Sequence, residues 1–272
     1  MTQREIKHKP TRRQAALWLF LLLVVPFFYL FKNQIVKLWY GQMQCEEPRR
    51  REWKHFETPI PPGYAVHGID VSDYSCKIDW NEVKKMNSNG VKVRFAFMRA
   101  TRGTNEIDLQ FTENWESTKE AKILRGAYHF YKYSHDPISQ AHFFLKNVTI
   151  ETGDLPAVLD IEDDKKTNDL DLNKADIIKG LSIWLDVVEQ ETGIKPIIYT
   201  NLDYYKRYIA FNFPNHKIWI ANYNNMRGVK LPDGKTWSIW QIGDKARCNG
   251  VSEKIDFNIF NGSIEDLKAF CK

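Results

Sequence analysis

Several features that mark other protein classes are missing from this chain of 272 residues. It has only four cysteines, with no CxxC pair and no cluster with histidine, which argues against a structural zinc site. No glycine-rich phosphate loop follows a strand, which argues against a nucleotide-binding fold. The formal net charge of +5 comes mostly from the first 31 residues, so the remaining chain gives no electrostatic reason to expect nucleic acid as a partner.

An uncharged apolar run follows the basic N-terminus. It occupies residues 15–31, and about 17–25 apolar residues cross a bilayer as a helix. Basic residues in 1–14 predict that this tail stays in the cytoplasm. A cleaved signal peptide is the alternative, but the small residues of a cleavage site are absent after the run. We therefore expect a single-pass signal anchor in the cytoplasmic (inner) membrane, with the rest of the chain on its periplasmic or extracellular side.

Residues 32–64 have the composition of a linker. A charge cluster at 46–52 is followed by the proline-rich stretch 59–63, which favours an extended, solvated segment. The folded domain is expected over residues 65–272. If this domain is exported, disulfides are permitted, and three pairings are open among Cys45, Cys76, Cys248 and Cys271.

Short β-type runs alternate with helical patterns from residue 65 onward. Such alternation predicts either a barrel or a doubly wound sheet. The clearest helix is expected over 174–191, where apolar residues recur at helical spacing and Gly193 follows. The last connections are short and lack strong helical patterns. The expected strands are 67–71, 93–99, 126–130, 157–162, 196–200, 217–221, 237–241 and 254–257.

Polar residues end several of the expected strands, and active sites of barrels gather at the carboxyl ends of strands. Asp160 and Glu162 end an apolar run and lie one residue apart, so their side chains point to the same face. Two acids at the end of a buried strand are costly unless that end is a site. Paired carboxylates suit the cleavage of glycosidic bonds. The other such residues are Asp70, Arg99, His129, Gln241 and Asp256, of which His129 is expected to have a structural role.

An ordered set of short motifs runs through the expected domain. The motifs are Gly68-Ile69-Asp70-Val71-Ser72, Ile78-Asp79-Trp80, Arg99-Ala100-Thr101, Gly126-Ala127-Tyr128-His129-Phe130, Leu159-Asp160-Ile161-Glu162, Ile198-Tyr199-Thr200, Trp219-Ile220-Ala221, Trp240-Gln241 and Ile255-Asp256-Phe257-Asn258. In this order, over about residues 66 to 262, the chain resembles glycoside hydrolase family 25, the Chalaropsis-type lysozymes. The resemblance implies a modified TIM-like (β/α) barrel with some later strands antiparallel, and it implies no metal and no organic cofactor.

The resemblance also implies roles for individual residues. Glu162 corresponds to the general acid, which later activates water, and Asp160 to the residue that assists the 2-acetamido group of the substrate. Asp70 and Asp256 complete an acidic quartet that hydrogen-bonds substrate or tunes the other two acids. The implied substrate-binding residues are Tyr128, Tyr199, Trp219 and Gln241.

Two positions depart from the family pattern. Ser75-Cys76 stands where Gln-Gly is frequent, and Arg102 replaces a common glutamate. The second departure changes the charge beside the expected cleft, so it bears on substrate preference and pH optimum. Neither departure removes a member of the quartet.

The resemblance implies cleavage of the β-1,4 bond between N-acetylmuramic acid and N-acetylglucosamine, and together with the N-terminal apolar run it predicts a membrane-anchored muramidase. Its expected partners are the glycan strands of peptidoglycan and, through residues 15–31, the membrane, and its catalytic domain is expected to be monomeric. One alternative is a catalytically silent barrel that binds peptidoglycan. Another is a scaffold for a membrane complex, which the linker permits without positive support.

Overall fold

The computed structural model describes residues 52–162, 173–223 and 228–271. The signal anchor predicted at 15–31, the tail before it and most of the expected linker lie outside these residues. Within the described ranges, no helix is both long enough and apolar enough to span a membrane.

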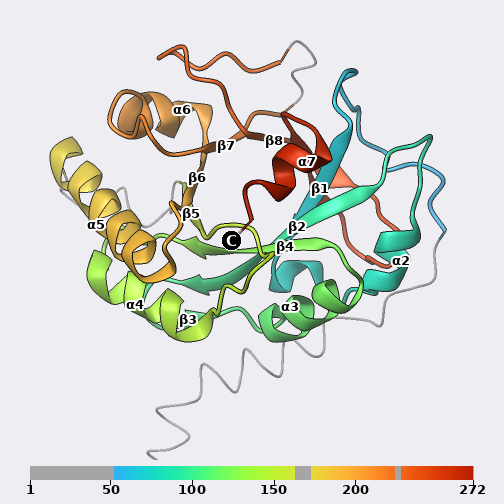
Figure 1. Cartoon of the computed structure of the whole chain (residues 1–272), viewed down its shortest axis with the longest axis horizontal. Helices are drawn as coiled ribbons and strands as arrows, with labels where there is room; N and C mark the ends of the chain where they lie inside the picture. Colours follow the sequence, from blue (N-terminus) through green and yellow to red (C-terminus); the bar gives the residue numbers. More distant parts are fainter. Residues whose placement is uncertain (1–51, 163–172, 224–227, 272) are drawn as a thin grey trace, which may run out of the picture. The chain divides into compact units, whose positions relative to one another are not determined.

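Eight strands close into a barrel, because β1 pairs with both β2 and β9 (Figure 1). This closure excludes the doubly wound sheet. Neighbouring strands are parallel except at β9, which is antiparallel to both β8 and β1. The expected modified barrel is therefore confirmed. The strands are β1 (Val66–Val71), β2 (Val93–Arg102), β4 (Leu124–Phe130), β5 (Val158–Ile161), β6 (Ile197–Asn201), β7 (Ile218–Ala221), β8 (Ile239–Ala246) and β9 (Ile255–Phe260). A two-residue strand, β3 (Glu106–Ile107), extends the sheet from β2.

The longer helices lie around the outside of the barrel (Figure 1). They are α2 (Trp80–Lys85), α3 (Phe111–Glu120), α4 (Pro137–Asn147) and α5 (Lys174–Thr192). Local sequence explains their ends: Asn173 caps the start of α5 through its side chain, and Gly193 ends it in the left-handed conformation. The connection after β6 holds only α6 (Leu202–Tyr204) and a π-helical turn (Tyr205–Ile209), as the weak helical pattern predicted.

Aromatic side chains fill the lower part of the barrel. Phe95 and Phe97 are fully buried on the inner face of β2. Their rings occupy the space beside Gly68 on β1 and Gly126 on β4, where a Cβ atom would overlap them. The short helix α7 (Ile264–Lys268) follows β9 and adds the buried Leu267 to this inner cluster. The interior is therefore closed at the end where the parallel strands begin.

The described part of the expected linker lies against the barrel. Phe56 is 1% exposed and packs on Phe257 of β9 with ring centroids 4.7 Å apart. The backbone N–H of Trp53 donates to Asn249 Oδ1 at 2.6 Å. Cys76 is disulfide-bonded, whereas Cys248 and Cys271 are free thiols. Cys45 lies outside the described residues.

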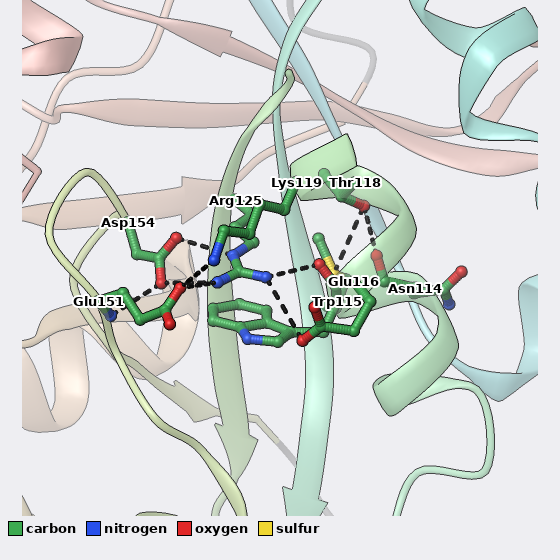
Figure 2. Close-up of polar contacts among 9 residues, drawn as sticks. Asn114, Trp115, Glu116, Thr118, Lys119, Arg125, Glu151 and Asp154 are labelled. Carbon is green, nitrogen blue, oxygen red and sulfur yellow. Dashed lines mark hydrogen bonds and ion pairs between the residues drawn. The ribbon is translucent and has the colours of Figure 1, made fainter. Parts of the chain in front are cut away.

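A buried arginine joins three elements on the outer side of the barrel. Arg125 of β4 donates to Asp154 Oδ1 at 2.7 Å, to Glu151 Oε2 at 2.9 Å and to the backbone oxygen of Trp115 at 2.8 Å. Its guanidinium lies 4.0 Å from the centroid of the Trp115 ring (Figure 2). Because Arg125 and Asp154 are 2% and 6% exposed, neither charge is compensated by water if the other is removed.

We expect Arg125→Met to lower the free energy of unfolding by about 3–5 kcal/mol, because it leaves Asp154 buried without its partner. Urea denaturation measures this loss. The control is Lys195→Met, which breaks the solvent-exposed pair between Lys195 and Glu189 and is expected to cost at most about 1 kcal/mol. Equal losses in the two variants would contradict a structural role for the Arg125 cluster.

Candidate active site

The quartet residues gather at one rim of the barrel. Asp70 and Asp160 lie on β1 and β5, and Glu162 directly follows β5. Asp256 was expected at the end of a strand, but it lies near the start of β9. Because β9 is antiparallel, its start meets the carboxyl ends of the parallel strands, and Asp256 is the register partner of Asp70. The structure therefore brings all four acids to the same rim.

Asp70 is 7% exposed and accepts hydrogen bonds from two side-chain amides. Gln241 Nε2 donates to Asp70 Oδ1 at 2.9 Å and to Oδ2 at 3.0 Å. Asn258 Nδ2 donates to Asp70 Oδ1 at 2.6 Å. Burial raises the pKa of Asp70 to about 6, although the hydrogen bonds from Asn258 and Gln241 lower it.

The two amides are fixed in turn by aromatic residues. Tyr199 and Tyr223 donate their hydroxyl groups to Gln241 Oε1 at 2.8 and 2.7 Å. The indole N–H of Trp219 donates to Asn258 Oδ1 at 2.8 Å. Trp219 is 1% exposed, so its ring lies beneath the rim. Of the residues implied to bind substrate, Tyr199, Trp219 and Gln241 thus belong to a hydrogen-bonded layer around Asp70.

Asp160 and Glu162 differ in exposure and contacts. Asp160 is 5% exposed, and its Oδ1 atom is buried without a hydrogen-bond partner in the part of the chain that the structure describes. Burial, Glu162 and Asp70 raise its pKa well above the ordinary value, while Arg99 and Arg102 lower it. Glu162 is half-buried, and burial raises its pKa, against the effect of a hydrogen bond with Tyr199. A raised pKa suits a glutamic acid to general acid catalysis.

The remaining site residues have distinct surroundings. Tyr128 of β4 is half-buried, and burial raises its pKa well above the ordinary value; the Arg99 charge opposes this, and the charges of Asp70 and Asp160 add to it. Burial raises the pKa of Asp256 to about 9, and the charges of Asp70, Asp244 and Glu162 add to this effect.

Arg99 connects the site to the loops beside it. Its side chain donates to Asp108 Oδ2 at 3.0 Å and pairs with Asp73, whose backbone N–H also donates to Asp108 Oδ2 at 2.8 Å. These bonds fix the turn Asp73–Ser75 after β1 against the start of α3. The guanidinium also lies 5.2 Å from the ring centroid of Tyr74.

Arg102 and His129 have different contacts. The Arg102 guanidinium lies 4.7 Å from the ring centroid of Phe130, and its charge lowers the pKa of Asp160. His129 is fully buried and contacts Thr101 Oγ1 at 2.8 Å and Gln140 Oε1 at 3.2 Å. Its structural role is confirmed.

Sequence reasoning missed two members of the site. Asn258 lies two residues after Asp256 in a strand, so the alternation of side chains already placed it on the same face. Tyr223 follows β7 in a loop, where no periodicity indicates direction. Among the described residues, no group of three or more His, Cys, Asp or Glu side chains is arranged to hold a metal ion.

The four carboxylic acids lie at the rim of a barrel, and two of them are separated by a single residue. This arrangement is typical of glycosidases that have a barrel fold. The family model for glycosyl hydrolases family 25 matches residues 69–251. The chain therefore belongs to glycosyl hydrolases family 25 and is a glycoside hydrolase.

Similar proteins come from bacteria and fungi. The uncharacterized protein YegX of Escherichia coli K12 is 40% identical over 248 residues, which cover 90% of this chain and 86% of YegX. Lysozyme M1 of Streptomyces globisporus is 31% identical and covers 75% of this chain and 71% of its own length. A solved family 25 glycosyl hydrolase from Bacillus anthracis superposes with a TM-score of 0.73 at 30% identity, covering 82% of this chain and all of that one.

The raised pKa of Asp256 predicts how stability depends on pH. The folded state keeps a proton on Asp256 up to about pH 9, whereas an unfolded aspartate loses it near pH 4. The folded state thus binds more protons in this interval, and the free energy of unfolding falls as pH rises, by at most about 1.4 kcal/mol per pH unit for one proton. Chemical denaturation between pH 5 and pH 8.5 measures this slope.

Asp256→Asn is expected to flatten the slope, because the amide does not titrate. Asp266→Asn is the control, since hydrogen bonds with Ser263 lower the pKa of that exposed carboxyl and its titration lies outside the interval. An unchanged slope in Asp256→Asn would contradict the assignment.

Proposed function

We propose that the protein is a lysozyme-type muramidase that hydrolyses the β-1,4 bond between N-acetylmuramic acid and N-acetylglucosamine in peptidoglycan. The observation that carries this proposal is the placement of Asp160 beside Glu162 at a rim that also holds Asp70 and Asp256. The names of relatives agree with it: one is Lysozyme M1, and an Arthroderma benhamiae protein, 27% identical, is an N,O-diacetylmuramidase.

In the proposed reaction, Glu162 gives its proton to the oxygen of the scissile bond as that bond breaks. The carbonyl oxygen of the substrate's own 2-acetamido group forms a bond to the anomeric carbon from the opposite face. Glu162, now a carboxylate, then takes a proton from water. The water oxygen bonds to the anomeric carbon and displaces the acetamido oxygen, which opens the ring that the acetamido group had formed. Two inversions give net retention, and no protein nucleophile is needed.

Asp160 is the group that assists the acetamido nitrogen. Its Oδ1 atom is buried and has no partner among the described residues, so it is available to accept the acetamido N–H. The positive charge that develops on the cyclised acetamido group favours the carboxylate form of Asp160. In this way the substrate supplies a partner that Oδ1 of Asp160 lacks among the described residues.

Mass spectrometry of fragments released from purified cell walls tests the proposal. Products ending in reducing N-acetylmuramic acid are expected. Ends with reducing N-acetylglucosamine would indicate a glucosaminidase, and anhydro-muramic ends would indicate a lytic transglycosylase. Binding to walls without release of fragments would instead support the silent barrel.

We further propose that residues 15–31 anchor the protein in the cytoplasmic membrane, with the barrel on the outer side. The apolar run with basic residues before it supports this orientation, and so does the disulfide at Cys76, since disulfides persist in oxidising compartments. The test is digestion of intact spheroplasts by an added protease. Degradation of the barrel without membrane lysis is expected, and protection until lysis would contradict the orientation.

A further inference from the structure

We infer that Asn258 and Gln241 are positioning residues whose side-chain amides together hold Asp70 as an oriented carboxylate at the reaction centre. This inference rests on the proposed function, because it assigns to Asp70 the task of facing the positive charge that forms on the sugar. It gives Trp219 and Tyr223 the task of orienting the two amides.

The donors around Asp70 select its charged form. Oδ1 accepts two N–H groups, at 2.6 Å from Asn258 and 2.9 Å from Gln241, and Oδ2 accepts one at 3.0 Å. An amide nitrogen only donates hydrogen bonds, so both carboxylate oxygens act as acceptors here. A carboxyl group whose two oxygens both accept is best satisfied without a proton.

The orientation of the Asn258 amide is determined by its second contact. An indole N–H only donates, so the Asn258 atom that lies 2.8 Å from Trp219 Nε1 must be the oxygen. The nitrogen of Asn258 therefore points to Asp70. Gln241 Oε1 accepts two tyrosine hydroxyls, at 2.8 and 2.7 Å, while its Nε2 donates to both oxygens of Asp70. The N–H groups of both amides therefore face the carboxylate before substrate binds.

The amides oppose every other influence on Asp70. Burial and the charge of Glu162 favour the protonated form of Asp70, whereas the hydrogen bonds of Asn258 and Gln241 favour the ionised form. The ionisable groups that interact with Asp70 are Glu162, Asp160, Asp256, Tyr128, Tyr199 and Tyr223. None of these six groups carries a positive charge, and the two amides are the groups found to lower the pKa of Asp70.

The consequence is that Asp70 and Glu162 take different protonation states in the site. Asp70 keeps its charge, and the proton needed for the leaving oxygen remains on Glu162. If Asp70 lost its amide donors, it would bind a proton at higher pH and no longer face the sugar as an anion. Activity would then require a higher pH. In a plot of activity against pH, the fall at high pH, which Glu162 sets, would change less.

The test compares pH profiles of kcat/KM for the wild type and Asn258→Leu, using release of fragments from soluble glycan strands. The variant is expected to lose about 10- to 100-fold in kcat, as when a supporting hydrogen bond is removed from a site. Its acidic limb is expected to move about one unit or more toward higher pH, because the donor that favours ionised Asp70 is gone.

The matched control is Asn114→Leu. Asn114 is also buried, at 3% exposure, and its Oδ1 also accepts an indole N–H, from Trp80 at 3.0 Å, but it lies on α3 outside the barrel. This variant is expected to lose stability without a shift of the pH profile. If Asn258→Leu lowers the melting temperature as Asn114→Leu does and leaves the acidic limb in place, Asn258 is merely structural and the inference fails.

A milder variant keeps the test informative if Asn258→Leu does not fold. Tyr223 is 39% exposed, and Tyr223→Phe removes only one donor to Gln241 Oε1. We expect a several-fold lower kcat, an upward shift of the acidic limb and an intact fold, with Tyr205→Phe, which removes a hydroxyl bonded to Asp233 at 2.8 Å, as the control. A Tyr223→Phe profile equal to wild type would overturn the inference. A wild type that releases no fragments would instead overturn the proposed function.

Discussion

Glu162→Gln is expected to lower kcat on peptidoglycan by about a thousand-fold, because the amide has no proton to give to the leaving oxygen. KM should change little, since glutamine has nearly the same shape. The loss should be much smaller on an aryl glycoside whose leaving group departs without protonation, although the later activation of water remains impaired. Steady-state kinetics on both substrates measures the difference.

The control for this variant is Glu189→Gln in the last turn of α5, where the carboxylate pairs with Lys195 at 2.7 Å. It makes the same chemical change away from the rim and should leave kcat unaltered. A Glu162→Gln enzyme that keeps a tenth or more of the wild-type kcat on peptidoglycan would show that another group is the general acid.

Asp160→Asn is expected to lower kcat by about 100- to 1,000-fold, which is the range for removing one preorganised electrostatic contact from a transition state. The amide carries no negative charge to balance the cyclised acetamido group. The variant should also bind a thiazoline mimic of that cyclic intermediate much more weakly than the wild type. Calorimetry with the mimic measures this affinity without turnover.

Substrates with a fluorinated acetamido group complete the test of Asp160. Fluorine withdraws electrons from the attacking carbonyl oxygen, so the wild-type rate should fall steeply with each fluorine added. Asp186→Asn on the exposed side of α5 serves as the folding control. A rate independent of fluorination would show that the acetamido group of the substrate does not attack the anomeric carbon.

Much of the fold follows from local sequence, because side-chain alternation and helical spacing act over a few residues. The expected strands are present with shifts at their ends, the largest at 237–241 against Ile239–Ala246 of β8, and the helix expected over 174–191 is α5 (Lys174–Thr192). The direction of β9 does not follow from alternation, which is the same in either direction. The resemblance to the family implied antiparallel late strands, and the pairing of β9 with β1 shows which strand it is.

The site could be predicted only in part for a related reason. The acids were found because buried carboxylates at strand ends are costly without a function. Asn258 is neutral and fits a buried strand once its amide is bonded, so composition gave no signal for it. The sequence also carried no sign that Phe56, in the described end of the expected linker, packs on the barrel. Neighbouring prolines and charges dominate the composition of that stretch.

The closed lower end of the barrel means that glycan and water both reach the proposed site from the rim. Phe95 and Phe97 fill the space beside Gly68 and Gly126, and Leu267 adds to the same plug. In the proposed double displacement, water attacks the anomeric carbon from the face that the released fragment vacates, so this fragment departs before water takes its place. An added sugar acceptor that fills the vacated place should compete with water and yield transglycosylation products.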